Sequence, residues 1–250
     1  MVVLFYLGTH MPSWFSKTEV PLFVSRRKLS ERKTFPRALG PWALDSGGFT
    51  ELSMFGEWQT TPKVYAKDVA RFSDEIGGMN WAAPMDWICS PFVLEKTGLT
   101  VKDHQQRTVE NLVELRSISD QPFIPVLQGW EYGDYLSHID MYDTAGIDLL
   151  NEPLVGVGSI APRQGTLEVM SIITTIRALG IRPHGFGVKL SGLRRYGLGL
   201  ESADSMSWSY GARFDTPMAG HTHKTCANCL EYALAWREQI VRSTELPRRY

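Results

Sequence analysis

Residues 42–49 read Trp-Ala-Leu-Asp-Ser-Gly-Gly-Phe, and this segment carries the strongest information about the fold. Its first part, Trp42–Asp45, has the apolar character of a parallel strand that is covered on both faces. The strand ends at a carboxyl group followed by two glycines, which allow a tight turn or a close approach of a ligand to the backbone. The segment therefore predicts a buried strand whose carboxyl end carries functional groups.

Short apolar runs of this kind alternate with amphipathic segments along the chain. Besides Trp42–Asp45, the predicted strands are Val2–Leu7, Trp81–Asp86, Phe123–Gln128, Leu154–Gly158, Gly185–Leu190 and Ser202–Trp208. The predicted helices are Pro62–Ile76, Asp103–Ile118 with a capping box of Asp103 and Gln106, Gln164–Leu179 and Ala227–Arg242. This alternation predicts an α/β fold, a (β/α)8 TIM-like barrel with a C-terminal helix. Because only seven strands are visible, we expect the barrel to be incomplete or irregular at the last strand.

The composition and charge of the chain exclude several classes of protein. The chain has 250 residues, of which 43% are hydrophobic, and a formal net charge of -1, which excludes a disordered chain and a uniformly basic nucleic-acid binder. We expect one domain over residues 1–250, with a Cys/His segment and helix over about residues 220–250. No apolar run is long enough to span a membrane, and the N-terminus lacks the basic region of a signal peptide. The three cysteines fit a reducing compartment, so we expect a cytoplasmic protein without membrane association.

Polar side chains gather at the predicted carboxyl ends of the strands, where parallel α/β folds place their active sites. Asp45, Asp86 and Asp204 end three separate strands, and Gln128 ends a fourth. Each aspartate could instead cap a helix or turn, or pair with a lysine. Three carboxylates at buried strand ends nevertheless favour a working site over a purely structural one, since burying an unpaired carboxylate is costly.

Five segments, in order, resemble motifs of the tRNA-guanine transglycosylase superfamily. Asp45-Ser-Gly-Gly-Phe49 resembles its D-S-G-G-aromatic strand end, and Pro84-Met-Asp86 with Cys89-Ser-Pro91 resembles its F-D-E-C-x-P segment. Val126-Leu-Gln128-Gly129 resembles its V-Q-G segment, and Val155-Gly-Val-Gly158-Ser159 resembles its Gly-rich strand end. Asp204-Ser-Met-Ser-Trp208 resembles the archaeal-type D-S-A-S-Y. The similarity spans residues 40 to about 210, and each motif by itself is short.

The resemblance implies a role for each matching residue. Asp204 would be the nucleophile and Asp45 the general acid and base. Ser46, Gly47, Gly48, Phe49, Asp86, Gln128 and Gly158 would bind the base, with Phe49 stacking on it. Such a pair of carboxyls suits the cleavage of an N-glycosidic bond, because one can attack the oxocarbenium-like sugar and the other can protonate the departing purine. Base exchange of this kind needs no redox or nucleotide cofactor, and none is expected.

The C-terminal segment contains His221, His223, Cys226 and Cys229, which have the types and spacing of zinc ligands. The superfamily builds a structural zinc site from C-x-C-x2-C and a distant histidine, whereas Lys224 stands here where the first cysteine would fall. We expect a zinc site in which the two histidines replace the missing ligands. The alternative is a reduced C-x2-C that opens the last helix, with Cys229 in the core.

The resemblance implies a nucleic acid and a 7-deazaguanine base as substrates. The short chain is most similar to the compact branch that inserts 7-deazaguanine derivatives into DNA, so we favour a DNA guanine transglycosylase, with tRNA as the other substrate to consider. Ser25–Arg37, which holds six basic residues, is either a solvated loop or a loop that contacts phosphates. Together with Arg194-Arg195 and Arg248-Arg249 it is a candidate for phosphate contacts. The alternatives are an N-glycosyl hydrolase that uses the same carboxylates with water, and a non-catalytic partner subunit. A homodimer is left open.

Overall fold

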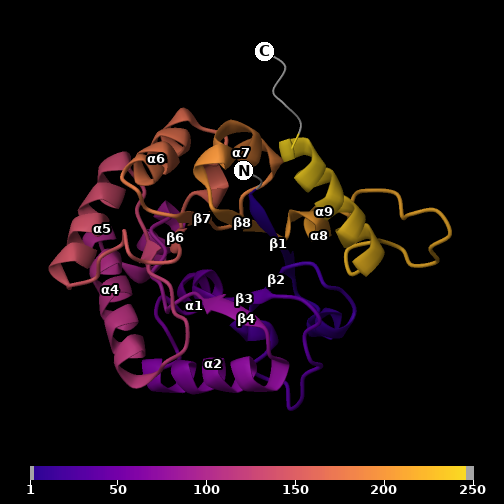
Figure 1. Cartoon of the computed structure of the whole chain (residues 1–250), viewed down its shortest axis with the longest axis horizontal. Coiled ribbons are helices and arrows are strands. Elements are labelled where there is room, and N and C mark those ends of the chain that lie inside the picture. The colour runs from indigo at the N-terminus through magenta and orange to yellow at the C-terminus, as the bar shows by residue number, and fades with distance from the viewer. Residues whose placement is uncertain (1–2, 246–250) are drawn as a thin grey trace.

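The computed structural model describes residues 3–245 and shows a curled, eight-stranded parallel sheet surrounded by helices (Figure 1). The strands are β1 (Leu4–Thr9), β2 (Leu22–Ser25), β3 (Trp42–Asp45), β4 (Met79–Ala82), β5 (Val126–Leu127), β6 (Val155–Val157), β7 (Pro183–Gly185) and β8 (Ser202–Ser205). Their order in the sheet is β4-β3-β2-β1-β8-β7-β6-β5. The outer strands meet through an isolated parallel bridge between Ala82 of β4 and Phe123 before β5. An α/β fold with an incomplete TIM-like barrel is therefore confirmed.

Helices follow most of the strands and cover the outer surface of the sheet (Figure 1). They are α1 (Gly48–Phe55), α2 (Pro62–Ile76), α3 (Pro91–Thr97), α4 (Val101–Ile118), α5 (Tyr132–Thr144), α6 (Leu167–Ala178), α7 (Leu190–Tyr196), α8 (Ser207–Gly211) and α9 (Leu230–Glu245). Short 3-10 helices lie at Pro12–Ser16, Arg26–Lys28, Ala161–Arg163 and Gly197–Gly199. The predicted C-terminal helix is confirmed as α9, which packs against β1 and α7.

Helix α2 shows how the sequence sets these elements. The Thr61 side chain accepts a hydrogen bond from the Val64 amide at the start of the helix, and Pro62 occupies the first turn, where its missing N–H costs nothing. A buried stripe that includes Val69 and Phe72 then packs on the sheet, and Gly77 ends the helix at a φ of 71°. The predicted bounds Pro62–Ile76 are those of the structure.

Two hydrophobic cores lie on the two sides of the curled sheet. The larger one is formed by residues between the strands and the helices, such as Leu44, Val69 and Val157. The smaller one fills the inside of the sheet with Tyr6, Phe23, Ala43, Trp81, Ala83, Ile124 and Leu154. Because neighbouring strand residues point to opposite faces, one core inside and one outside is the packing of a barrel-like sheet.

The strand missing from the sequence prediction is β2, not a late strand. It is four residues long and follows β1 after a 3-10 helix rather than an α-helix, so the strand–helix rhythm does not mark it. The expected irregularity at the last strand was wrong. Residues of β8 pair with both β1 and β7, whereas the weakly paired seam lies between β4 and β5.

Several other predicted elements have different bounds in the structure. Strand β7 shares only Gly185 with the predicted Gly185–Leu190, because Gly187 turns the chain with a φ of 65° and α7 begins at Leu190. Strand β8 ends at Ser205, and the rest of the predicted Ser202–Trp208 enters α8. The capping box of α4 is formed by Thr100 and Asp103, not by the predicted Asp103 and Gln106. Thr100 is the N-cap residue, and Asp103 is the third residue of the helix.

The predicted C-terminal helix Ala227–Arg242 begins three residues later in the structure, at Leu230. The predicted helix Gln164–Leu179 likewise begins at Leu167, after Thr166 caps it. Within residues 3–245, the structure contains no helix with the length and apolar character required to cross a membrane.

Candidate active site

A pocket of about 940 Å3 opens at the carboxyl ends of the strands. The residues that line it include Asp45, Ser46, Phe49, Asp86, Gln128, Gly158 and Asp204, all of which were proposed from the sequence. Asp45 ends β3, Asp204 lies near the end of β8, and the others follow β3, β4, β5 and β6, so the parallel arrangement of the strands brings distant parts of the chain together. Gly47 and Gly48 do not line the pocket and lie buried in the turn behind Asp45.

The turn after β3 uses its two glycines for different reasons. Gly47 has a φ of 81°, a conformation that glycine adopts without steric cost. At Gly48, a Cβ atom would lie 2.9 Å from the carbonyl oxygen of Asp86, so a side chain would push the two loops apart. The turn leads into α1 and leaves Phe49 58% exposed at the pocket, where its ring is available to a flat ligand.

Asp45 has an acidity suited to proton exchange near neutral pH. Burial, aided by the negative charges of Asp86 and Asp204 and opposed by a hydrogen bond with the Ser25 side chain, raises the pKa of its carboxyl to about 6. Asp45 thus senses the charge of both other carboxylates. A carboxyl with a pKa near 6 is present in both protonation states at physiological pH, which general acid–base catalysis requires.

Asp86 is buried, and each of its two carboxylate oxygens accepts one hydrogen bond from a neighbouring side chain. The Ser46 hydroxyl donates to its Oδ1 at 2.8 Å, and the Gln128 side-chain amide donates to its Oδ2 at 2.6 Å. Burial raises the pKa of Asp86, and both hydrogen bonds oppose that shift because they favour the carboxylate. The resulting unit joins the ends of β3, β4 and β5 on one wall of the pocket.

The orientation of the Gln128 amide is fixed from both sides. Its Nε2 donates to Asp86, and its Oε1 accepts a hydrogen bond of 2.6 Å from the Ser159 hydroxyl. Ser159 holds a left-handed φ of 58°, and its Oγ also accepts from the Cys89 amide. Gly158 makes room for this amide, since a Cβ atom there would lie 2.2 Å from Gln128 Nε2.

The opposite part of the pocket contains Asp204. Its Oδ1 accepts a hydrogen bond of 3.0 Å from the amide of Gly187, in the turn after β7. His184 Nε2 lies 3.4 Å from the same oxygen. Within residues 3–245, no hydrogen bond reaches Oδ2 of Asp204, which leaves that oxygen available to a ligand in the pocket.

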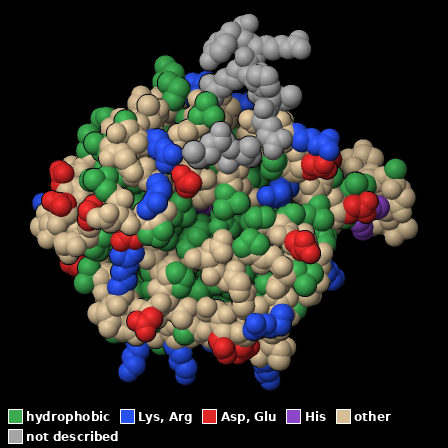
Figure 2. All heavy atoms as spheres, in the orientation of Figure 1, with side chains coloured by type: hydrophobic (Ala, Val, Ile, Leu, Met, Phe, Trp, Pro, Cys, Tyr) green, Lys and Arg blue, Asp and Glu red, His purple; other side chains and the backbone are tan. Residues whose placement is uncertain are grey.

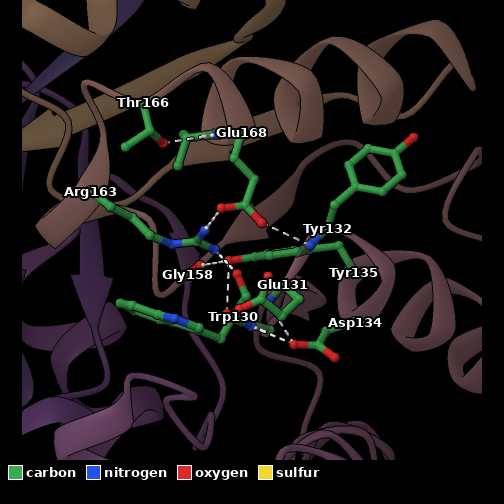
Figure 3. Close-up of polar contacts among 11 residues, drawn as sticks. Trp130, Glu131, Tyr132, Asp134, Tyr135, Gly158, Arg163, Thr166 and Glu168 are labelled. Atoms are coloured by element: carbon green, nitrogen blue, oxygen red, sulfur yellow. Dashed lines mark hydrogen bonds and ion pairs between the residues drawn. The ribbon is translucent and has the colours of Figure 1, made fainter.

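A second layer of contacts holds the loops after β5 and β6 beneath this site (Figure 3). Tyr135 donates from its hydroxyl to the carbonyl oxygens of Gly129 and Gly158. Asp134 accepts hydrogen bonds from the amides of Trp130 and Glu131. Arg163 stacks over the Trp130 ring at 4.5 Å, pairs with Glu168 and donates to the Trp130 carbonyl oxygen. These contacts fix the backbone that carries Gln128 and Gly158.

Several pocket residues escaped the sequence analysis. Phe186 lines the pocket beside the predicted residues, and Gly156 makes room for its ring, since a Cβ atom there would lie 2.5 Å from Phe186 Cε2. The Gly-x-Gly pattern of β6 was therefore a signal for two close approaches. Buried His138 hydrogen-bonds the Gln128 backbone, and burial lowers its pKa to about 4, so it is neutral near pH 7.

The tryptophans next to the predicted site residues do not line the pocket. Trp87 packs under the Arg107 guanidinium, Trp130 under that of Arg163, and Trp208 donates from its indole nitrogen to the Gly8 carbonyl oxygen. Their aromatic rings serve packing rather than the site itself.

The model of the family described as DpdA, DeoxyPurine in DNA protein A, matches residues 1–249. The chain belongs to the DpdA family. This match confirms the resemblance to the compact branch of the superfamily that handles 7-deazaguanine in DNA. No curated protein matches the chain.

In this DpdA-family chain, the basic residues of Ser25–Arg37 are partly committed to internal contacts. Arg26 pairs with Asp68, Arg27 pairs with buried Glu51, and Arg37 donates to main-chain carbonyl oxygens. Lys28 is exposed and lines the pocket. Arg194 and Arg195 lie at the end of α7, which leads back to the start of β8 and away from the pocket, and Arg248-Arg249 falls outside the described residues.

The four predicted metal ligands come together beside α9. Their ligand atoms all lie within 4.8 Å of one another. His221 Nδ1 is 3.3 Å from His223 Nε2 and 3.6 Å from Cys229 Sγ, and His223 Nε2 is 3.2 Å from Cys226 Sγ. A tetrahedral ion would hold such donors about 3.3–3.8 Å apart, so the cluster fits a metal. In Figure 2, purple histidine atoms are visible on the part of the molecule that projects at the right of the view.

One further contact and the exposure of Cys229 also suit a metal centre. His221 uses its second nitrogen, Nε2, to contact Glu231 at 3.0 Å, which is the usual arrangement of a carboxylate behind a histidine ligand. Cys229 is half-buried rather than enclosed in a core, unlike the alternative in which it only packs the last helix. The cluster is placed away from the pocket lining.

We predict that Gly158→Ala impairs the site without unfolding the protein. The added Cβ displaces the Gln128 amide and breaks its hydrogen bonds to Asp86 and Ser159, so binding of a purine base should weaken. Gly165→Ala is the matched control, because a Cβ there meets no atom within 4 Å. Isothermal titration with guanine and circular dichroism check this; equal affinity of the two variants would contradict the account.

Proposed function

We propose that this protein is a DNA guanine transglycosylase that exchanges a guanine of DNA for a 7-deazaguanine base. One observation carries the proposal: Asp45, Asp86, Gln128 and Asp204 line one pocket. Membership of a family named for a deoxypurine in DNA supports DNA as the nucleic acid. The target base must leave its stack to enter the pocket, as in other enzymes that react at a base.

Asp86 and Gln128 are suited to hold the base. The Asp86 carboxylate can accept hydrogen bonds from the N1–H and N2–H groups of guanine, and the second N–H of Gln128 can donate to O6. Replacing N7 by carbon leaves this edge of the base unchanged, so guanine and a 7-deazaguanine can occupy the pocket in turn. Phe49 and Phe186 line the same pocket and offer aromatic faces for stacking.

Asp204 is the nucleophile and Asp45 the acid in the first half of the proposed reaction. Oδ2 of Asp204 forms a bond to C1′ as the C1′–N9 bond breaks, and Asp45 donates a proton to the departing guanine. In the second half, Asp45 takes the proton from the incoming base, whose nitrogen attacks C1′ and releases the Asp204 carboxylate. Two displacements retain the configuration at C1′.

DNA would reach this pocket from the side of the strand ends. Lys28, exposed at the pocket, is the residue of Ser25–Arg37 that we propose to contact a phosphate next to the flipped nucleotide. Arg26 and Arg27 instead support the loop through their ion pairs with Asp68 and Glu51.

The direct test offers labelled 7-cyano-7-deazaguanine to the protein together with either double-stranded DNA or tRNA. We expect label in the DNA, accompanied by the release of free guanine, and no incorporation by Asp204→Asn. Label found in tRNA alone would overturn the choice of DNA. Release of guanine without incorporation of label would identify a hydrolase instead.

The pH dependence should report the protonation of Asp45. Because its pKa is raised to about 6, the acid form is lost as the pH rises through that value, and loss of guanine in the first half-reaction should slow above pH 6. Single-turnover rates between pH 5 and 8.5 measure this. Asp86→Asn is the comparison: it removes the other raised carboxyl, so at saturating DNA a descending limb should remain, moved to lower pH because the Asp86 charge no longer raises the pKa of Asp45. A rate that stays flat or increases over this range would contradict the role of Asp45.

We further propose that the His221, His223, Cys226 and Cys229 cluster holds a structural zinc ion. Zinc would cross-link the segment before α9, and no step of the reaction depends on it. Thiol modification followed by a chromogenic chelator should release about one zinc per chain from the wild type and from Cys89→Ala, which lies outside the cluster. Cys226→Ser should release far less. Less than about half an equivalent from the wild type would contradict the proposal.

A further inference from the structure

His184 is a buried histidine inside the sheet that the proposed reaction has not yet used. It belongs to β7 and is 0% exposed. Its ring is packed by Trp81 at 4.7 Å, Phe186 at 4.8 Å, Phe23 at 5.9 Å and Tyr6 at 6.1 Å between centroids. Four aromatic neighbours leave the ring little freedom, so the direction of its two nitrogens is fixed by packing.

The two nitrogens face two groups of β8. Nδ1 lies 2.8 Å from the Ser202 hydroxyl, and Nε2 lies 3.4 Å from Oδ1 of Asp204. Within the described residues, Nε2 makes no hydrogen bond that satisfies ordinary geometry. A buried nitrogen without a partner is costly, and the Asp204 carboxylate oxygen at 3.4 Å can provide that partner.

The tautomer follows from these neighbours. If Nδ1 carried the proton, the lone pair of Nε2 would face a carboxylate oxygen and the two would repel each other. If the Ser202 hydroxyl donates to Nδ1, the proton lies on Nε2 and points toward Asp204. The second arrangement satisfies all three groups, so the Asp204 carboxylate selects the tautomer with the proton on Nε2, and the serine hydroxyl accommodates it by donating to Nδ1.

We infer that His184 is a positioning residue for Asp204. It holds Oδ1 through Nε2–H, in the tautomer that the carboxylate favours and that the Ser202 hydroxyl supports at Nδ1, and thereby presents Oδ2 to C1′ of the sugar. This inference rests on the proposed role of Asp204 as nucleophile. The contact of 3.4 Å is longer than an ideal hydrogen bond, and contacts of this kind commonly tighten once substrate is bound.

The same contacts give the two carboxylate oxygens of Asp204 different roles in the proposed reaction. The Gly187 amide and His184 both contact Oδ1, which leaves Oδ2 to form the bond to C1′. Oδ1 then becomes the carbonyl oxygen of the glycosyl ester. In the second half-reaction the C1′–Oδ2 bond breaks and the negative charge returns to the carboxylate. A donor fixed at Oδ1 stabilises that charge without giving up its proton.

Two variants test the inference in the full-length protein with DNA and labelled 7-cyano-7-deazaguanine. His184→Phe keeps an aromatic ring among the four aromatic neighbours but removes the donor, and Ser202→Ala removes the hydrogen-bond partner of Nδ1 that helps to orient the imidazole. We expect each to lower kcat, His184→Phe by about 10- to 100-fold, with little change in KM for the base, because Asp86 and Gln128 bind the base independently. Should His184→Phe fail to fold, the NMR measurement described below still decides, because it uses the wild-type imidazole.

His104→Phe is the matched control. This histidine is also 0% exposed, but it contacts Thr97 and the Ile88 carbonyl oxygen, away from Asp204. It should keep the wild-type kcat apart from any loss of folded protein. A folded His184→Phe with wild-type kcat, or an equal loss of kcat in His104→Phe, would overturn the inference.

A second readout does not depend on activity. Long-range 15N–1H NMR of the imidazoles should show His184 protonated at Nε2, and Asp204→Asn should shift that resonance. A proton on Nδ1 would overturn the inference. If the wild type exchanged no base in DNA, the proposed function would fail, whereas this spectrum would still establish or refute the contact between His184 and Asp204.

Discussion

The hydrogen bond between Gln128 and Asp86 is the interaction on which the rest of the site depends. Asp86 follows β4 and Gln128 follows β5, the two strands that meet through one bridge only, so this bond of 2.6 Å joins the sheet at its weakest seam. It also orients the Gln128 amide for binding a base. The Ser46 hydroxyl donates to Oδ1 of Asp86, and the Ser159 hydroxyl donates to Oε1 of Gln128. The missing side chain at Gly158 makes this packing possible, which ties the shape of the barrel to the chemistry of the pocket.

The second constraint is the gathering of three carboxyls in one cavity. Their mutual repulsion and burial would destabilise the fold if all were charged and unpaired, and the structure meets this cost differently at each of them. Asp86 receives donors on both oxygens, Asp204 receives the Gly187 amide on one, and Asp45 has its pKa raised to about 6. These different environments match the roles proposed for them: binding the base, attacking the sugar and exchanging a proton.

The sequence predicted those parts of the molecule that have a local signal. Helix α2 has a cap, a proline, an apolar stripe and a terminal glycine within one window, and its bounds were found. The strand-end residues of the pocket were found because each sits in a short motif. Strand β2 was missed since four residues after a 3-10 helix give no periodicity, and β7 was displaced because the turn at Gly187 looks apolar. His184 had no signal, since its role arises only from packing across the sheet.

The account stands on a sugar that becomes bonded to Asp204 during base exchange. The most direct measurement is to quench the wild-type protein with DNA in denaturant, digest both components and locate the modified peptide by mass spectrometry. The account predicts one nucleotide adduct on the peptide that contains Asp204, at the position of Asp204 itself. An adduct on Glu201, which pairs with Arg177, or on Asp215, which accepts a hydrogen bond from Tyr232, would contradict it, as would turnover without any adduct.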